Sequence, residues 1–407
     1  MYKGKKALPS VLFVILFLLC MLIIYSNIKI TDLVEISENF YTNYNEVELA
    51  NEDNRFGRMV SLSFEENEVQ TGSNKNKEGT ILFKLFGLIP IKKVKVNVLE
   101  DEDVYVGGVP IGIYLQTDGT MVVSDTVVDV GSGAVIKNKS LKSGDIIKKI
   151  NGVVINSAED ISNVLENIKG DTTSVEVIRD NKVKDIEAGL IKNKENKYKL
   201  GVWVKDDISG IGTLTFVKKD SGEYGALGHP VITGDSSTII PVSSGKIYDC
   251  NLIGINKGCK NKPGELRAVF LQKNEKGNIT KNTPYGIFGN ISNLDDLVDT
   301  NRCLKIGGRL SVKPGKAKIV SSVSGIREEY DIEIIKANFQ SKSSDKSIVF
   351  RVTDERLLSL TGGIVQGMSG SPIVQNDKIV GAVTHVFLSD SSKGYGVYSD
   401  WMLEQLD

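Results

Sequence analysis

The segment from Gly367 to Val374 constrains the fold of this chain more than any other stretch. It places Ser369 between two glycines and follows them with Pro372 and an apolar run typical of a β-strand. A glycine at 367 allows a sharp turn, so that its N–H and that of Ser369 can point at one spot and hold negative charge. Turns rich in glycine and serine are also common as plain connections. The motif alone leaves a reactive serine and an ordinary turn as near-equal alternatives.

A histidine upstream of this serine favours the reactive alternative. The chain has only two histidines, and His229 lies between Gly228 and Pro230 after the apolar run 212–217. A serine hydroxyl is a poor nucleophile until a base takes its proton, and histidine is the side chain that titrates near neutral pH. A lone histidine is more often a hydrogen-bonded structural residue. Its place in a Gly-His-Pro turn, with only one other histidine available, favours His229 as the base.

Four stretches of the sequence resemble a known peptidase family. They are residues 85–90, 210–216, 225–229 and 361–373. These motifs are similar to those of the stage IV sporulation protein B (SpoIVB) peptidases of endospore-forming bacteria, and the resemblance covers most of residues 80–407 together with the N-terminal anchor. The pattern Gly-x-Ser-Gly-x-Pro is similar to the nucleophile loop of chymotrypsin-like serine proteases. The resemblance implies a mostly β protein with some α-structure, built from a membrane anchor, a PDZ domain and a chymotrypsin-like β-barrel peptidase domain.

The resemblance also implies an activity and a place in the cell. Proteins of this family are membrane-anchored serine endopeptidases of endospore formation, exported to the space between the forespore membranes. They cleave themselves, and they cleave a membrane-bound regulator in the sigma factor processing complex, through an acyl-enzyme. The expected partners are that protein substrate, the chain's own N-terminal segment and the membrane. No cofactor and no metal are expected.

Catalytic roles follow for particular residues. Ser369 attacks the scissile carbonyl, the N–H groups of Gly367 and Ser369 stabilise the oxyanion, and His229 transfers the proton. The family's aspartate maps to Asp354, fifteen residues before Ser369. Any such carboxylate could instead be solvated or cap a turn. Two competitors for the third role also follow the histidine in the chain, namely Asp235 and Asp249.

The second histidine, His385, lies on a strand expected after the serine. Residues 373–386 predict a hairpin with a turn at Asn376-Asp377. In chymotrypsin-like folds the returning strand lines the primary specificity pocket. We therefore hypothesise that His385 faces this pocket and donates a hydrogen bond to a polar side chain of the substrate. A histidine packed in a strand is the simpler alternative, and His385 as the base in place of His229 is a third.

Composition limits the other classes of function. A length of 407 residues suffices for two or three domains, and a net charge of −1 gives no electrostatic case for nucleic-acid binding. Cys20 lies in the N-terminal apolar run, which leaves three cysteines, so a complete set of disulfides within the chain is impossible. A bridge between Cys250 and Cys259 is conceivable. The cysteines and histidines show no zinc-ligand spacing.

Residues 1–28 predict an uncleaved signal anchor. Three lysines precede an apolar run over 11–24, and no small-x-small cleavage site follows. The lysines should stay in the cytoplasm and the rest of the chain should be exported. Residues 29–103 are expected to form a polar linker and leading strands. The exposed loop 73–79 lies in the stretch where self-cleavage would fall most easily, because a protease needs an extended flexible substrate.

Residues 104–190 resemble a PDZ domain of exported bacterial proteases. The signature lies within 141–152, and a helix is expected from Ser157 to Gly170. A PDZ domain binds a peptide as an added strand, with backbone amides holding its terminal carboxylate. The corresponding residues, which could equally be an ordinary strand start, are Ile111, Gly112 and Ile113.

The remainder of the chain predicts a barrel. Residues 191–199 are charged and suggest a linker, and residues 200–407 alternate short apolar runs with turns before a C-terminal helix. Two functions of other classes remain as rivals: an inactive PDZ adaptor that tethers partners at a membrane, and a scaffold without catalysis. The intact serine, histidine and glycines argue against both. An esterase-type Gly-x-Ser-x-Gly elbow is absent, because position 371 is serine.

Overall fold

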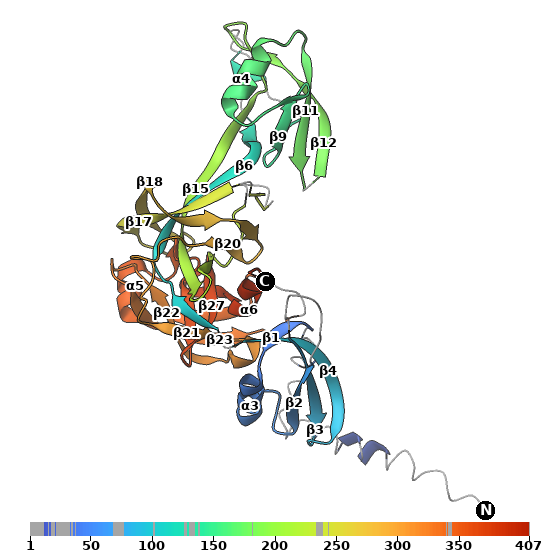
Figure 1. Cartoon of the computed structure of the whole chain (residues 1–407), viewed down its shortest axis with the longest axis vertical. Coiled ribbons are helices and arrows are strands. Elements are labelled where there is room, and N and C mark those ends of the chain that lie inside the picture. The colour runs from blue at the N-terminus through green and yellow to red at the C-terminus, as the bar shows by residue number, and fades with distance from the viewer. Residues whose placement is uncertain are drawn as a thin grey trace, which may run out of the picture.

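The computed structural model describes most of the chain in three packed units. It covers residues 38–406 except 68–76, 101, 126–127, 130–134, 137–138, 181, 233–238, 243, 339 and 341–343, and also describes residues 12–14, 16–17, 21, 33 and 36. A small α/β unit with helix α4 lies at one end of the long axis, a sheet of β1 to β4 lies at the other, and a β-barrel body lies between them (Figure 1). The prediction of a mostly β protein with some α-structure is confirmed.

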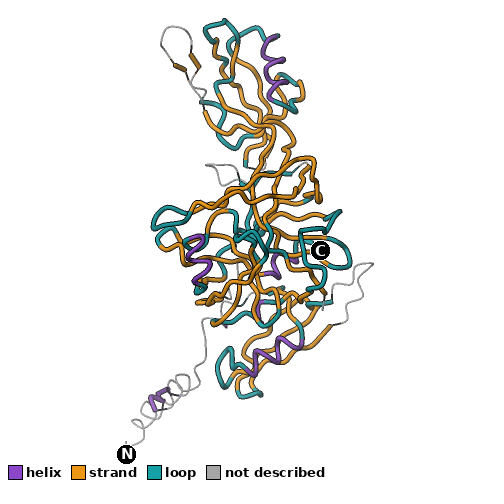
Figure 2. The backbone as a smooth tube through the Cα atoms, turned by 90° about the vertical axis from the view of Figure 1, so that its left-hand side faces the viewer, coloured by secondary structure: helices purple, strands orange, loops and turns teal. Residues whose placement is uncertain are grey.

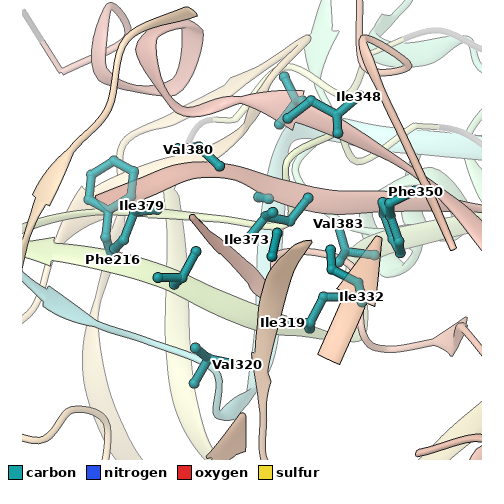
Figure 3. Close-up of a cluster of buried hydrophobic side chains, with 14 of the residues drawn as sticks. Phe216, Ile319, Val320, Ile332, Ile348, Phe350, Ile373, Ile379, Val380 and Val383 are labelled. Atoms are coloured by element: carbon teal, nitrogen blue, oxygen red, sulfur yellow. The ribbon is translucent and has the colours of Figure 1, made fainter. Parts of the chain in front are cut away.

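The barrel body contains two separate hydrophobic cores. One gathers side chains of the C-terminal strands, such as Ile319 and Ile373, together with Phe216 (Figure 3). The other is built around Ile111 and Leu214. The strands connect through hydrogen bonds into one closed system. The second core is formed mainly by β6 (Pro110–Asp125), β15 (Val202–Lys218), β16 (Glu223–Ala226), β17 (Ser244–Asn256) and β20 (Gly286–Asn290).

The C-terminal core has its own set of strands. They are β21 (Cys303–Ile306), β22 (Gly315–Ser321), β23 (Glu328–Ala337), β24 (Ile348–Val352), β25 (Val365–Gln366), β26 (Pro372–Gln375), β27 (Lys378–Phe387) and β28 (Asp390–Tyr398). The predicted turn between β26 and β27 is confirmed, because Asn376 and Asp377 adopt φ of 52° and 55°. The predicted C-terminal helix is also confirmed as α6 (Ser399–Leu403), which packs Trp401 and Met402 into this core.

Strands β6 and β15 join the barrel to the α/β unit. They pair antiparallel from Pro110 with Thr213 to Asp125 with Val202, through two irregularities. Both run from the barrel into the upper unit as a continuous ribbon (Figure 1). The core changes along β6: Leu115 belongs to the barrel, whereas Val122 belongs to the upper unit.

The α/β unit with helix α4 contains the strands and the helix that the PDZ prediction requires. Its strands are β9 (Ile146–Ile150), β10 (Val153–Val154), β11 (Thr172–Arg179) and β12 (Lys182–Gly189). The expected helix is α4 (Ala158–Glu166), which begins at a capping box of Ser157 and Asp160. Arg179 and Asp145 form a bidentate ion pair at 2.6 Å beneath the sheet. The segment expected to be a charged linker instead forms a hairpin of β13 (Ile191–Lys192) and β14 (Tyr198–Lys199).

The N-terminal unit departs from the polar linker that the sequence predicts. Strands β1 (Phe40–Thr42), β2 (Val60–Asn67), β3 (Glu78–Leu85) and β4 (Ile89–Val98) form a sheet, and helix α3 (Tyr44–Glu52) packs with it. The linker expectation is corrected for residues 38–67. Helix α3 carries the buried carboxyl group of Glu46, which breaks the apolar periodicity that sequence reasoning needs.

Glu46 ties this N-terminal unit to the barrel. Its carboxylate accepts hydrogen bonds from Gly308 N at 2.8 Å and from Lys378 Nζ at 3.2 Å. Burial raises the pKa of Glu46, and the charge of Lys378 opposes that rise. Most of the predicted anchor at 1–28 lies outside the described residues. Within the part that is described, none of the helices is both long and apolar enough to span a bilayer.

Candidate active site

The serine loop is held in place by strand β15. Thr213 donates from its N to Ser369 O at 2.9 Å and from its Oγ1 to Gly367 O at 2.6 Å. Thr215 Oγ1 donates to Gly370 O at 2.8 Å. Gly367 and Gly370 adopt φ of 96° and 97°, the left-handed region that favours glycine. The strand that enters the PDZ unit therefore also fixes the backbone around the candidate nucleophile.

Gly370 is required by close approach as well as by its dihedral angle. A Cβ built on it would lie 2.0 Å from the carbonyl oxygen of Thr213. In the folded chain the space beside it is already occupied by the backbone of β15.

The side chain of Ser369 makes one hydrogen bond among the described residues. Its Oγ donates to the carbonyl of Thr384 at 2.8 Å. Its N–H has no hydrogen-bond partner among the residues that the structure describes, whereas the next two N–H groups donate to Val383 O and Met368 O. The hydroxyl must therefore leave Thr384 before it can attack a substrate, and the N–H of Ser369 is available to an oxyanion.

His229 follows strand β16 through a tight turn. Leu227 and Gly228 both adopt positive φ, 70° and 71°, and such a strained angle at a buried leucine is typical of functional sites. His229 Nδ1 lies 2.9 Å from the carbonyl oxygen of Pro230. A carbonyl only accepts, so Nδ1 carries the proton and Nε2 keeps its lone pair. Burial lowers the pKa of His229, so the ring is neutral near pH 7 and can act as a base.

One cleft unites these residues. Its volume is about 590 Å³, and its lining includes His229, Ser369 and His385. Strand β15 forms one wall with Ile208, Ser209, Gly210 and Ile211. Leu227, next to the histidine, belongs to one barrel core and Met368, next to the serine, to the other. The candidate site thus lies where the two cores of the barrel body meet.

A second histidine and a carboxylate adjoin the base. The rings of His229 and His385 have centroids 5.1 Å apart. His385 Nδ1 is buried without a hydrogen-bond partner among the described residues, and it lies 3.6 Å from Asp345 Oδ2. Burial and the neighbouring His229 lower the pKa of His385, while the charge of Asp345 opposes that shift. Thr384 Oγ1 also donates to the backbone carbonyl of Asp345.

Comparison with known proteins decides the family. A family model described as SpoIVB peptidase S55 matches residues 196–403, just over half of the chain. The chain belongs to the SpoIVB peptidase family. It is therefore a serine peptidase, and a PDZ-domain model matches residues 109–190.

Other comparisons add little to the description of this SpoIVB-family peptidase. Among solved structures, the PDZ domain of the SdrC-like protein from Listeria monocytogenes matches at 21% identity with a TM-score of 0.18, covering 23% of this chain and 93% of that one. No curated protein matches the chain.

In this SpoIVB-family peptidase, Asp354 lies in a structural setting rather than on the cleft. It caps helix α5 (Glu355–Thr361) by accepting from Arg356 N at 2.9 Å. It also accepts from Arg356 Nη2 at 2.8 Å and from Asp331 N at 3.2 Å. The Arg356 side chain holds the pKa of Asp354 at about 2. Its described hydrogen bonds do not include His229, and its place in the triad stays a prediction.

Of the two competitors for the third role, only Asp249 lies within the described residues, and its described hydrogen bonds do not include His229. Asp249 accepts a hydrogen bond from the adjacent Cys250 N at 3.0 Å. Asp235 lies outside the described residues. Sequence reasoning missed Asp345, the carboxylate that faces both histidines. Its surroundings, Ser344-Asp345-Lys346, carry no motif that could have identified it.

The predicted peptide-binding strand needs correction. Ile111, Gly112 and Ile113 pair with β15 on one side and with β17 on the other. A strand with both edges paired offers no free N–H or C=O to an added peptide. The local sequence pattern of a strand start is the same whether or not its edge is free, which explains the error.

The three cysteines that the structure describes are free thiols, namely Cys250, Cys259 and Cys303. Cys259 is exposed and Cys250 is buried, so the conceivable bridge between them does not form. Burial raises the pKa of Cys250 to about 11. This thiol is therefore protonated at neutral pH and a poor nucleophile.

Proposed function

We propose that this chain is a membrane-anchored serine endopeptidase of endospore formation. It cleaves itself and a membrane-bound regulator of sigma factor processing, in the space between the forespore membranes. The sporulation role and the substrate rest on membership of the SpoIVB family. The observation that carries the catalytic part is the shared cleft of Ser369 and His229 at the junction of two barrel cores.

The proposed reaction uses the groups on this cleft in order. Substrate displaces the Ser369 hydroxyl from Thr384 O, and the hydroxyl turns toward His229. Nε2 of His229 accepts the proton as Oγ attacks the scissile carbonyl, and the N–H groups of Gly367 and Ser369 hold the oxyanion. The histidine then protonates the leaving amine, and water hydrolyses the acyl-enzyme by the same route.

Orientation of the base differs from a standard triad in this proposal. The carbonyl of Pro230 accepts the Nδ1 proton of His229 and fixes the tautomer. The charge of Asp345 favours the imidazolium that forms during attack, since it raises the pKa of His229. His385 lines the same cleft with 39% of its side chain exposed, and its ring can donate to a polar substrate side chain.

Self-cleavage is tested by mass spectrometry of the purified protein over time. Wild type should release an N-terminal fragment, and Ser369→Ala should stay intact under the same conditions. Ser369→Ala protein that still processes itself would overturn the proposal.

One observation favours a second function, an inactive PDZ adaptor that tethers partners at a membrane. The Ser369 hydroxyl is bonded to Thr384 O rather than to a histidine. A fluorophosphonate probe separates the two functions, because it reacts only with an activated serine. Labelling of Ser369 would exclude the adaptor, and a folded protein that resists the probe would support it. Whether the PDZ unit holds substrate or the chain's own N-terminal segment is tested by deleting that unit.

A further inference from the structure

The tip of the β3–β4 hairpin carries an exposed apolar surface that the peptidase activity does not use. All six residues from 86 to 91 are exposed. Leu88 is 83% exposed, Ile89 55%, Phe86 48% and Ile91 45%. Apolar side chains scattered singly on a surface are ordinary, but a contiguous group of them marks a contact site. We call residues 86–91 the apolar tip.

The turn at this tip places a phenylalanine at a position where turn geometry does not favour one. Phe86 and Gly87 adopt φ of 55° and 72°, and Leu88 N donates to Leu85 O at 3.1 Å. A positive φ is unfavourable for a bulky side chain, and asparagine or aspartate is preferred there. The β26–β27 turn of the same chain follows that preference with Asn376 and Asp377. An exposed phenylalanine in a strained position therefore points to a role for its side chain.

Positive charge surrounds the apolar tip. The β3–β4 hairpin contains four lysines and one acidic residue, Glu78, which pairs with Asn97 at the end of the hairpin opposite the tip. Lys92 is used inside the unit, where its Nζ donates to Leu33 O at 2.7 Å and to Ile36 O at 3.1 Å. The other three, Lys84, Lys93 and Lys95, form no ion pair with the residues that the structure describes. An apolar surface edged by unpaired lysines matches the two parts of an anionic lipid surface.

The same end of the molecule carries the start of the chain. The first helical turns and the β1–β4 unit lie at one end of the long axis in both views, and α4 lies at the other (Figures 1 and 2). Leu12 and Phe13 in those turns are 60% and 73% exposed. Leu33 and Ile36 are buried in the core of the β1–β4 unit, so the chain that leaves the apolar N-terminal run enters the unit that presents the hairpin.

We infer that the apolar tip inserts into the interfacial region of an anionic lipid membrane, with Lys84, Lys93 and Lys95 contacting the headgroups. The six exposed residues of the tip are far fewer than the roughly 20–30 residues per side of a stable protein interface. Insertion into lipid needs no matching surface. This second contact would hold the β1–β4 unit against the bilayer and leave the PDZ unit at the far end, and it does not depend on the peptidase chemistry.

The test measures the depth of a tryptophan placed at the tip. Full-length Ser369→Ala protein, which cannot shorten itself, carries Trp203→Phe to remove the exposed native tryptophan. Leu88→Trp is added in one sample, and Val183→Trp, which replaces a 65% exposed residue on β12, is the matched control. Both proteins are reconstituted into vesicles of phosphatidylcholine, with or without phosphatidylglycerol, that contain brominated acyl chains. Flotation of the vesicles reports total binding.

The expected result is strong quenching of Leu88→Trp in anionic vesicles and little quenching of Val183→Trp. Adding Lys84→Gln and Lys93→Gln should reduce the quenching at least severalfold in anionic vesicles and much less in neutral ones. If the protein floats with vesicles and both tryptophans are quenched equally, the hairpin inference is overturned while the N-terminal anchor stands. If the protein does not float at all, both membrane contacts are overturned.

Discussion

The cleft and the start of helix α5 differ in whether their polar groups have hydrogen-bond partners. On the cleft, the N–H of Ser369 and Nδ1 of His385 have no partners among the described residues. At α5, Asp354 accepts hydrogen bonds from Arg356 and Asp331. A buried polar group without a partner costs stability, and folding alone does not select it. We conclude that the cleft is arranged for substrate and the Asp354 cap for the fold, although both regions carry residues that the family motif includes.

Among substitutions that leave Ser369 and His229 in place, Gly370→Ala should have the largest effect on the cleft. Gly370→Ala places a Cβ against Thr213 O, which must move the strand that positions Ser369. We expect the rate of fluorophosphonate labelling to fall on the order of a hundredfold or more, as for loss of an oxyanion donor. Gly152→Ala is the matched control, because Gly152 also has a positive φ but open space around it. Its labelling rate should not change, and Gly370→Ala protein that labels normally would contradict the packing argument.

Substituting Asp354 should change stability more than chemistry. Asp354→Ala removes the cap and the partner of Arg356, and should lower the free energy of unfolding by about 1–2 kcal/mol. Asp354→Asn keeps the cap and should lose less. The labelling rate of the folded protein should stay near that of wild type. If Asp354→Asn abolishes labelling while its melting temperature is unchanged, the aspartate is catalytic and the comparison fails.

Low pH should remove the contribution of the Asp354 cap to the free energy of unfolding. Arg356 lowers the pKa of Asp354 from 3.8 to about 2, so the ion pair stabilises the fold fully above pH 3.8. As the pH falls from 3.8 through about 2, the carboxylate becomes protonated in the unfolded and then in the folded state, and the contribution disappears. Urea unfolding of wild type and Asp354→Asn should therefore converge in free energy over this range. A difference that persists below pH 2 would show that the charge is not its source.

A smaller shift is expected when the charge of Asp345 is removed. Its charge raises the pKa of both His229 and His385. Asp345→Asn should therefore lower both values further and move the acid limb of the labelling rate to lower pH. Asp249→Asn is the control and should leave the profile in place. An unchanged profile in Asp345→Asn would remove this carboxylate from the account of the base.

The smallest effect is expected on substrate preference. His385→Ala should alter the residue favoured before the scissile bond, and His385→Gln, which keeps a donor, should alter it less. Cleavage of a peptide library by the active enzyme measures this preference. The same preference in all three proteins would leave His385 as a histidine packed in a strand.

These contrasts show which parts of the site could be predicted from sequence. Ser369 and His229 lie in turns whose glycines make them recognisable locally, and the structure brings both to one cleft. Asp345 lies in a loop without a motif and meets the histidines only through the tertiary fold. Asp354 was assigned from the sequence, but a family resemblance cannot distinguish a capping carboxylate from a catalytic one. The paired strand at Ile111–Ile113 was misassigned because its sequence does not record which edges are covered.

The same reasoning explains the N-terminal unit. Helix α3 lacks a clear apolar face because it buries the carboxyl group of Glu46. Hydrogen bonds from Thr42 in the same unit and from Gly308 and Lys378 in the barrel make that burial tolerable. By contrast, α4 was predicted closely, since its capping box and apolar face are local features.

The central claim is that Ser369 is activated by His229, and site-mapped fluorophosphonate labelling tests it most directly. The adduct should be found on Ser369 of the wild-type protein and be absent from Ser369→Ala. His229→Ala should slow labelling on the order of a thousandfold while the melting temperature stays close to that of wild type. Labelling of Ser369 at the wild-type rate in His229→Ala would contradict the account and transfer the role of base to His385.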